Sequence, residues 1–464
     1  MRLSTAEIAG ILGYKDNLGP GMVSGYSIDS RSVQPGDLFF AIRGPRFDGR
    51  EYVGQALEKG AMAAVVQEDF ESAHPKWPLI RVDGTEQALQ RLASAVRRRW
   101  GGPLIGITGS TGKTTTKEMI AAVLGRRFRV LKSAGNLNNH FGVPLTLLRL
   151  TPEHEVAVVE MAMSAPGEIA RLASLAGPQT GVVTNVAPAH LEFFDSVESI
   201  ARAKRELIER LEPPEAAILN HDDERVRGFT EGFKGRVVTY GFTEGSDYRG
   251  LRVRAPILAA NGQPSTEFEV DGPDWVQWFS IPLAGRHNVE NALAAIATGG
   301  LFGISSQDSR VALESLRLPG QRADVLRLAG NITVINDAYN SSPRAMERMI
   351  ETLASWPGAK RRIVLAGEML ELGISSPELH RHIGRECAIA GVDWLIAVQG
   401  EASFFLEGAR EAGLPAERIA FFPAAREAGR FCRALMRAGD VILVKGSRAV
   451  KLEEAVAAMQ EAGD

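Results

Sequence analysis

The stretch of residues 106–116, Gly-Ile-Thr-Gly-Ser-Thr-Gly-Lys-Thr-Thr-Thr, constrains the fold more than any other part of the sequence. The apolar residues 103–107 predict a short buried strand, and residues 115–124 predict a helix. A strand, a glycine-rich turn and a helix N-terminus form an anion site, because backbone N–H groups and the helix dipole both favour negative charge. We therefore interpret this stretch as a nucleoside triphosphate loop.

The residues of this loop have distinct expected roles. Lys113 would reach the outer phosphates, and the Thr114 hydroxyl would hold Mg²⁺. The usual pattern has glycine at position 107, whereas this chain has Ile107 and carries its glycines at 106, 109 and 112. A flexible turn before an ordinary helix is the alternative, and the flanking strand and helix argue against it. The residues expected to bind the nucleotide here are Gly109, Ser110, Thr111, Gly112, Lys113, Thr114 and Thr115.

Length and composition define the class of protein. The chain has 464 residues, which is enough for about three domains. It is 45% hydrophobic with a net charge of −3, so we expect a folded, soluble protein with no nucleic-acid partner. No segment has the roughly 18 apolar residues of a membrane helix, and Glu7 interrupts the N-terminal apolar run, so no signal peptide is expected. Cys387 and Cys432 form no C-x-x-C pair, which favours the cytoplasm.

Residues 1–83 are predicted to form a small α/β N-terminal domain. Ser4 and Glu7 match a capping box that opens an amphipathic helix. Residues 27–31 place short polar groups and an arginine at the end of a predicted strand. From the residues alone, a ligand-binding rim and a solvated loop are equally consistent with this pattern.

Residues 84–317 are predicted to form a central ATP-binding domain with a parallel sheet around the triphosphate loop. Glu160 ends one predicted strand, and His190 follows another. Ligands of open α/β sheets bind outside the carboxyl ends of the strands, so both residues should lie at the same edge as the loop. Glu160 would bind Mg²⁺ directly or through water. A salt-bridged acid and an ordinary histidine are the alternatives.

Lys204 is the most informative residue after Lys113. Steps of three and four place it between Ile200 and Ile208 on the apolar stripe of a predicted helix. Burial disfavours a charged lysine. The residue pattern alone favours a side chain that extends to water. The alternative is a neutral amine that reacts with CO₂ and gives a carbamate ligand for Mg²⁺.

Asn288 and Asn291 begin a later predicted helix and, three residues apart, share one face. Their amides suit contacts with the edge of a purine. A capping asparagine plus an exposed one is the alternative reading of the pair.

Residues 318–464 are predicted to form a C-terminal Rossmann-like domain. Apolar strands alternate with helices, which indicates βαβ units and a mostly parallel sheet. Polar residues follow the strand ends at 336–340, 367–368 and 445–448. These residues form a rim that would face a nucleotide bound elsewhere, since no dinucleotide-binding glycine pattern is present.

Taken together, these residues resemble the Mur ligase family of ATP-dependent amide-forming enzymes over essentially the whole chain. The shifted glycines of residues 108–114 match the form of the loop in that family. Residues 29–39 and 44–49 look like its uridine-nucleotide module. The chain lacks the Asp-Asn-Pro-Arg signature of the members that add a diamino acid. The stretches most similar to members that add D-alanyl-D-alanine are residues 136–144, residues 337–343, and residues 367–373 followed by His380.

The resemblance implies a role for each matching residue. Catalytic roles fall to Lys113, to His190 and to Lys204 as a carbamylated lysine. The implied metal ligands are Thr114, Glu160, His190 and Lys204. Besides the loop, the implied nucleotide contacts are Asn288, Asn291, Arg322 and Asp337. The implied contacts of the UDP-sugar substrate are Ser30, Arg31, Asn138 and Asn139. Ser342 is a departure, because the family commonly has asparagine before Pro343.

The resemblance further implies the reaction and its partners. We expect a cytoplasmic, monomeric enzyme that uses ATP and Mg²⁺ to join D-alanyl-D-alanine to a UDP-linked muramoyl tripeptide in peptidoglycan synthesis. A sibling ligase that adds a different amine would need its own acceptor to stimulate ATP consumption. A nucleotide-gated binding protein or transporter-associated ATPase would hydrolyse ATP without any UDP-linked substrate.

Overall fold

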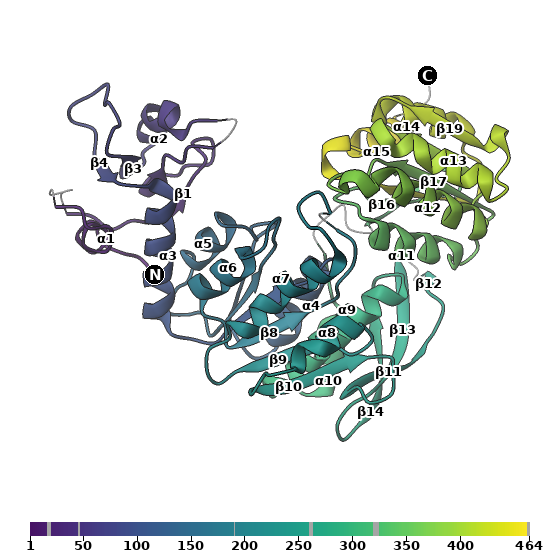
Figure 1. The fold of residues 1–464 in the computed structure, drawn as a ribbon, viewed down its shortest axis with the longest axis horizontal. Helices are drawn as coiled ribbons and strands as arrows, with labels where there is room; N and C mark the ends of the chain where they lie inside the picture. The colour runs from purple at the N-terminus through teal and green to yellow at the C-terminus, as the bar shows by residue number, and fades with distance from the viewer. Residues whose placement is uncertain (16–19, 45–46, 190, 259–262, 319–323, 462–464) are drawn as a thin grey trace.

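The computed structural model describes residues 1–15, 20–44, 47–189, 191–258, 263–318 and 324–461. The chain folds into three successive parts along a curve, from the N-terminal part at the left of Figure 1 to the C-terminal part at the right. Each part contains a mostly parallel sheet with helices on its faces, so the predicted fold class is confirmed. In the described part of the chain, no helix combines the length and the apolar character needed to cross a bilayer.

The N-terminal sheet is parallel, with its strands in the order β1-β2-β3-β4. Both faces of β2 are covered, because Leu38 and Phe40 belong to one apolar cluster and Phe39 to another. The predicted capping box is present, since Ser4 Oγ accepts the Glu7 N–H at 3.2 Å. The elements are α1 (Thr5–Leu12), β1 (Gly25–Ser27), β2 (Asp37–Phe40), η1 (Gly49–Tyr52), α2 (Val53–Glu58), β3 (Ala63–Gln67) and β4 (Leu79–Val82).

The long helix α3 (Thr85–Trp100) joins the N-terminal and central parts. Its residues Leu89, Leu92 and Val96 belong to one apolar cluster that also contains Leu38 of β2 and Leu172 of α6 (Glu168–Ala176). The helix therefore packs on both parts at once. The boundaries drawn at 83/84 and 317/318 stay predictions.

The central sheet is parallel along β6-β7-β5-β8-β9-β10-β11, and antiparallel strands extend it at one edge. This antiparallel extension was not predicted. The parallel strands are β5 (Leu104–Thr108), β6 (Val130–Lys132), β7 (Val156–Glu160), β8 (Thr180–Val183), β9 (Ala216–Asn220), β10 (Arg236–Gly241) and β11 (Tyr248–Val253). The extension consists of β12 (Ile257–Leu258), β13 (Pro264–Asp271) and β14 (Val276–Ile281).

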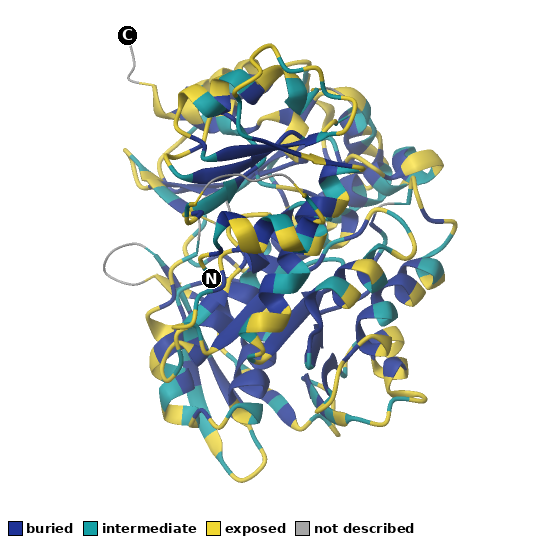
Figure 2. Ribbon diagram, turned by 90° about the vertical axis from the view of Figure 1, so that its left-hand side faces the viewer, coloured by how far each residue is buried: buried dark blue, intermediate teal, exposed yellow. Residues whose placement is uncertain are grey.

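Helices cover both faces of this sheet, and Figure 2 shows the strands in dark blue beneath helices whose outer surfaces are yellow. Alternate residues of β7 enter opposite clusters, with Val158 on the side of α4 and α9 and Val159 on the side of α7. A Cβ on Gly106 would lie 2.9 Å from Leu207 Cδ1, so glycine lets α7 approach β5 closely. The remaining helices are α4 (Lys113–Leu124), α5 (Gly142–Leu147), α7 (Val197–Glu209), α8 (Glu224–Arg227), η2 (Gly228–Thr230), α9 (Arg286–Leu301) and α10 (Ser306–Glu314).

The C-terminal sheet has the order β15-β16-β20-β17-β18-β19, in which only the β15–β16 pairing is antiparallel among the described residues. The predicted alternation of strands and helices is confirmed, although β15 was not predicted. The strands are β15 (Asp324–Leu328), β16 (Ile332–Asp337), β17 (Arg361–Gly367), β18 (Trp394–Val398), β19 (Ile419–Phe422) and β20 (Asp440–Lys445). The helices are α11 (Pro343–Ala354), η3 (Gly373–Ser375), α12 (Ser376–Ile389), η4 (Gly400–Ala402), α13 (Ser403–Glu411), η5 (Ala416–Arg418), α14 (Ala425–Leu435), η6 (Arg448–Val450) and α15 (Glu453–Gln460).

Candidate active site

The predicted phosphate loop connects the carboxyl end of β5 to α4, which begins at Lys113, two residues earlier than predicted. Gly112 has a φ of +81°, and a Cβ there would lie 2.5 Å from Asn291 Oδ1. A Cβ on Gly109 would lie 1.8 Å from Thr184 Oγ1. Positions 109 and 112 therefore require glycine. Ile107 lies within β5, before the turn, so position 107 does not.

The turn after β8 holds the phosphate loop in place. The N–H of Ser110 donates to the carbonyl of Asn185 at 2.9 Å, and the N–H of Thr111 donates to Asn185 Oδ1 at 3.0 Å. Ser110 Oγ donates to the carbonyl of Ala187 at 2.9 Å. Asn185 is thus a positioning residue of the loop that the sequence did not single out, although it lies at the carboxyl end of a predicted strand.

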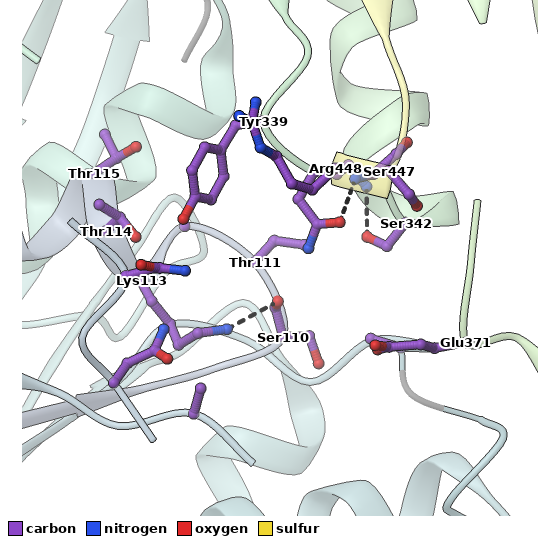
Figure 3. A pocket seen from close by; sticks show the side chains of 18 of the residues that line it. Ser110, Thr111, Lys113, Thr114, Thr115, Tyr339, Ser342, Glu371, Ser447 and Arg448 are labelled. Atoms are coloured by element: carbon purple, nitrogen blue, oxygen red, sulfur yellow. Dashed lines mark hydrogen bonds between the residues drawn. The ribbon is translucent and has the colours of Figure 1, made fainter. Parts of the chain in front are cut away.

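The amine of Lys113 folds back over the loop. Its Nζ donates to the carbonyls of Gly109 at 2.7 Å and Ser110 at 3.3 Å, and Figure 3 shows the side chain beside the loop in the cavity. A cation at this point adds positive charge where backbone N–H groups and the N-terminus of α4 already favour an anion. The loop therefore has the geometry of a phosphate-binding site.

Glu160 lies at the end of β7, beside the first turn of α4, and is 2% exposed. Thr114 Oγ1 donates to Glu160 Oε2 at 2.8 Å, and Asn138 Nδ2 donates to Glu160 Oε1 at 2.8 Å. The structure thus brings together three of the predicted site residues from three separate segments of the chain. The carboxylate is buried, and Lys117 Nζ lies 3.7 Å from its Oε2, so this geometry agrees with a metal ligand and with the salt-bridged acid alike.

The predicted Mg²⁺ ligands can be tested against this geometry. The Glu160 carboxylate and the Thr114 hydroxyl are adjacent oxygens on the cavity wall, and Mg²⁺ prefers such oxygens, with water and phosphate completing its shell. The donor pair fits the ion. Among the described residues no group of three histidine, cysteine or acidic side chains has metal-binding geometry. His190 lies outside the described residues.

Lys117 is a further charged residue that the sequence analysis missed. It lies one turn after Lys113 on α4 and is fully buried. Its Nζ is 3.7 Å from Glu160 Oε2 and 3.3 Å from Glu118 Oε1, and it donates to the carbonyl of Gly135 at 3.3 Å. The available signal was a lysine four residues after Lys113, which helical periodicity places on the same face.

Lys204 lies on α7 as predicted, and only 2% of its surface is exposed. The extension to water that the residue pattern favoured is therefore wrong. Burial, and next the nearby charge of Lys113, hold the pKa of the Lys204 amine well below its usual value. No carboxylate of the described residues counteracts this effect. This lowered pKa favours the neutral, nucleophilic form of the amine, which carbamate formation requires.

The predicted purine-binding asparagines line the cavity from the start of α9. Asn288 Nδ2 donates to the carbonyl of Ala284 at 2.8 Å, and Thr116 Oγ1 donates to Asn291 Oδ1 at 3.1 Å. Both asparagines are 4% exposed, so the alternative of a capping asparagine plus an exposed one is wrong. The neighbouring His287 also lines the cavity, and burial, then Arg348 and Lys445, lower its pKa to about 3.

The C-terminal domain forms the opposite wall. Lys445 Nζ, at the end of β20, lies 2.5 Å from Asp337 Oδ2 at the end of β16 and donates to the carbonyl of Asn340 at 2.9 Å. Lys445 belongs to the polar rim predicted at residues 445–448, although the sequence assigned it no contact of its own. Ser342 keeps a polar contact despite its departure from the family pattern, because its Oγ caps α11 by accepting the N–H of Ala345.

A cavity of about 640 Å³ lies between these walls. Figure 3 shows Lys113 and Thr114 at the left, Ser342 and Ser447 at the right, and the Tyr339 ring between these groups. The predicted site residues that line it are Ser110, Thr111, Gly112, Lys113, Thr114, Thr115, Asn138, Asn139, Glu160, Asn288, Asn291 and Asp337.

Other predicted site residues lie elsewhere. Ser30 and Arg31 belong to the N-terminal domain and do not line this cavity. Ser30 Oγ donates to Gln55 Oε1 at 2.6 Å, and the exposed Arg31 guanidinium pairs with Asp29 at 2.8 Å. Arg322, like His190, lies outside the described residues.

An ion pair also joins the two walls of the cavity. Arg348 Nη2 on α11 lies 2.7 Å from Glu290 Oε2 on α9, and both side chains are largely buried. Burial raises the pKa of Glu290, and the Arg348 charge opposes this shift. The pair connects the C-terminal domain to the helix that carries Asn288 and Asn291.

Family patterns match three successive segments of the chain. The "Mur ligase family, catalytic domain" matches residues 22–97, the "Mur ligase middle domain" residues 107–299, and the "Mur ligase, glutamate ligase domain" residues 321–448.

Curated proteins and solved structures match the chain over nearly all of its length. UDP-N-acetylmuramoyl-tripeptide–D-alanyl-D-alanine ligase of Bacillus subtilis is 36% identical, covering 94% of this chain and 93% of that protein. The Escherichia coli protein of the same name is 35% identical over 94% of this chain and 93% of its own length. A crystal structure of MurF from Acinetobacter baumannii has a TM-score of 0.89 with 30% identity, and covers 100% of this chain and 99% of that chain. MurF ligase from Thermotoga maritima in complex with ADP has a TM-score of 0.81 with 28% identity, covering 96% and 98%.

Proposed function

This chain belongs to the Mur ligase family, and we propose that it joins D-alanyl-D-alanine to the terminal carboxylate of UDP-N-acetylmuramoyl-tripeptide at the expense of ATP. The observation that carries this proposal is the cavity between the phosphate loop and the polar C-terminal wall. The enzyme is a carbon–nitrogen bond-forming ligase of peptidoglycan synthesis, and so acts in cell-wall biogenesis, cell shape and cell division.

The reaction needs activation, because a carboxylate and an amine do not condense in water. A carboxylate oxygen of the tripeptide attacks the γ-phosphorus of ATP, and ADP leaves with the electron pair of the broken bond. The amine of D-alanyl-D-alanine then attacks the acyl carbon of the resulting acyl phosphate. Inorganic phosphate departs, and the amine nitrogen loses its extra proton. Phosphoryl transfer asks the protein mainly for positioning and for neutralisation of charge.

The phosphate loop supplies both of these functions. Lys113 lies over the loop at the N-terminus of α4 and would contact the outer phosphates. Its charge opposes the negative charge that builds up on the transferred group. Asn288 and Asn291 would contact the adenine, and Asp337 and Arg322 would approach the nucleotide from the C-terminal domain.

Thr114 and Glu160 would hold Mg²⁺ through their adjacent oxygens. Mg²⁺ supplies positive charge to the phosphate oxygens when it is bound. We further assign His190 and Lys204 to the metal site, with Lys204 in its carbamylated form. The support for Lys204 is its buried amine with a lowered pKa.

The substrates meet the chain at two places. Ser30 and Arg31 would contact the uridine nucleotide at the N-terminal domain, while Asn138 and Asn139 would contact the sugar-peptide part at the cavity. The C-terminal wall would exclude water from the acyl phosphate, which otherwise hydrolyses.

We place the enzyme in the cytoplasm as a monomer. The buried, free thiols of Cys387 and Cys432 suit a reducing compartment.

A phosphate-release assay with a panel of amines tests the proposed reaction. UDP-N-acetylmuramoyl-tripeptide, ATP and Mg²⁺ are present throughout, and only the amine changes. We expect D-alanyl-D-alanine to stimulate phosphate release, and D-alanine or single diamino acids to have little effect. Equal release without the UDP-linked tripeptide, or stimulation by a different acceptor, would contradict the assignment.

A further inference from the structure

The fully buried lysine of α4, Lys117, does not line the cavity and so has no direct contact with a ligand there. We propose that Lys117 is a positioning residue that couples occupation of the nucleotide site to the affinity of the 133–139 loop for the UDP-linked substrate. The proposal rests on the function proposed above, because it takes that loop as part of the substrate site.

Lys117 lies between the two sites that it would couple. On one side its Nζ is 3.7 Å from Glu160 Oε2, the oxygen that also accepts the Thr114 hydroxyl. On the other side it donates to the carbonyl of Gly135, within the 133–139 loop, at 3.3 Å. One ammonium therefore contacts both the predicted metal ligand and the backbone of the substrate loop.

The 133–139 loop has two further attachments to Glu160. The N–H of Glu160 donates to Ser133 Oγ at 3.1 Å, and Asn138 Nδ2 donates to Glu160 Oε1 at 2.8 Å. Asn138 in turn accepts the N–H of Ala162 through its carbonyl at 2.8 Å. Glu160 is thus connected to the loop directly at Ser133 and Asn138, and through Lys117 at Gly135.

The charges around Lys117 alternate in sign. Glu118 Oε1 lies 3.3 Å from Lys117, and Glu118 Oε2 contacts Lys132 near the surface. Replacing buried ion pairs by apolar side chains of similar volume is often neutral or stabilising, so stability alone does not require an ion here. The buried charge of Lys117 instead suits a residue that responds to the arrival of another charge in the nucleotide site.

A cation bound by Thr114 and Glu160 would provide that charge. It would draw Glu160 Oε2 toward itself and repel the Lys117 ammonium, and both effects are strong where water is excluded. The contacts still available to Lys117 are Glu118 and the carbonyl of Gly135. The ammonium would therefore tighten its hold on the loop when the nucleotide site is filled, and the UDP-linked substrate would bind more strongly.

Calorimetric titration tests this coupling without catalysis. The dissociation constant of UDP-N-acetylmuramoyl-tripeptide is measured for the full chain alone and with Mg²⁺ and a non-hydrolysable ATP analogue. We expect the analogue to strengthen binding by at least about 5-fold in the natural protein, the lower end of typical coupling between sites. In the double variant Lys117→Met/Glu118→Gln, the analogue should change the dissociation constant of the UDP-linked tripeptide by less than about 2-fold. The dissociation constant without the analogue should change little.

Lys132→Met is the matched control, because it removes the other partner of Glu118 and leaves the Lys117 contacts with Glu160 and Gly135. It should keep the natural factor. If the double variant does not fold, Lys117→Gln, which lacks the charge but retains a donor, is measured instead and should also lose the factor. A charge-free variant that retains the natural factor, or a natural protein without any factor, would overturn the proposal. Failure of the natural protein to bind the UDP-linked tripeptide at all would refute the proposed function instead.

Discussion

At the scale of single residues, the charges that matter most to this site are removed from water. Glu160, Lys117 and Lys204 are each at most 2% exposed, and they come from β7, α4 and α7. Because water does not screen these groups, their interactions with each other and with bound ions are stronger than at the surface. Substitutions of Glu160 and Lys204 should therefore change catalysis by large factors, and substitution of Lys117 should change how substrate binding responds to the nucleotide.

Replacing the loop lysine tests the phosphate-site assignment. Lys113→Ala removes the charge that opposes the negative charge on the transferred phosphoryl group. We expect turnover to fall by at least about 100-fold, the scale seen when one charge-stabilising donor is lost. Steady-state rates with saturating substrates measure the effect. The exposed lysine variant Lys234→Ala serves as the control and should retain normal turnover. Near-normal turnover of Lys113→Ala would count against the loop assignment.

The carbamate at Lys204 predicts chemical rescue. Lys204→Ala should be nearly inactive, because it lacks the anionic oxygens that a carbamate would offer to Mg²⁺. A short carboxylic acid added to this variant should restore part of the activity by occupying the same space. Lys204→Arg cannot form the carbamate and should remain inactive even with the acid. Full activity of either variant without an added acid would refute the carbamate.

His287 predicts a pH dependence of stability. Its pKa is about 3 in the folded protein and near 6.5 in the unfolded chain, so between these values the unfolded state binds the extra proton. The free energy of unfolding should therefore fall as pH decreases from about 6.5 to about 3. In His287→Gln this contribution is absent, so the decrease should be shallower. Denaturant unfolding at a series of pH values measures the free energy of unfolding of both proteins. An identical pH dependence in the natural protein and in His287→Gln would disprove the lowered pKa of His287.

The position of the loop could be predicted from sequence, because a strand, a glycine-rich turn and the start of a helix follow one another there. The burial of Lys204 could not, since an apolar stripe is compatible with a side chain that bends to water and with one that does not. The role that we propose for Lys117 could not be predicted from sequence either. Its partners Glu160 and Gly135 belong to segments that meet it only in the folded chain.

At the scale of secondary-structure elements, strands covered on both faces were the easiest to predict. β18 is an uninterrupted apolar run, and β7 and β20 carry charged residues only at their ends, as expected for parallel strands between two layers of helices. The antiparallel strands β13 and β14 were missed. Polar residues interrupt both strands, so neither has the apolar run of the parallel strands, and the pairing of β11 with β13 contains a register shift. Such strands depend on their neighbours more than on their own sequence.

The contact between α9 and α11 predicts an effect across two domains. Arg348→Met would leave Glu290 largely buried without its partner, and breaking a buried pair typically destabilises a protein by about 3 kcal/mol or more. The melting temperature should then fall by roughly 5 °C or more for domains of this size. Scanning calorimetry measures it. Arg348→Met/Glu290→Leu removes both charges and should regain most of the loss. A double variant less stable than the single one would contradict the ion-pair account.

At the scale of the whole molecule, the site is assembled from domains that are far apart in sequence. The cavity is lined by the phosphate loop, by the 133–139 loop, by α9 and by the carboxyl ends of β16 and β20. Sequence patterns predicted the phosphate loop, the asparagines at the start of α9 and the polar strand ends at residues 336–340 and 445–448 as separate features. Asp337 and Lys445 form an ion pair between neighbouring strands of the C-terminal sheet. Sequence patterns could not predict that this pair lines the same cavity as the phosphate loop, because that placement depends on how two domains dock.

The account depends on an acyl phosphate formed inside this cavity, and isotope transfer tests that step most directly. The terminal carboxylate of UDP-N-acetylmuramoyl-tripeptide is labelled with ¹⁸O and allowed to react with ATP, Mg²⁺ and D-alanyl-D-alanine. One carboxylate oxygen should leave with the phosphate, so mass spectrometry or ³¹P NMR should find one labelled oxygen in each inorganic phosphate released. Unlabelled phosphate accompanied by formation of the peptide bond would contradict the central claim.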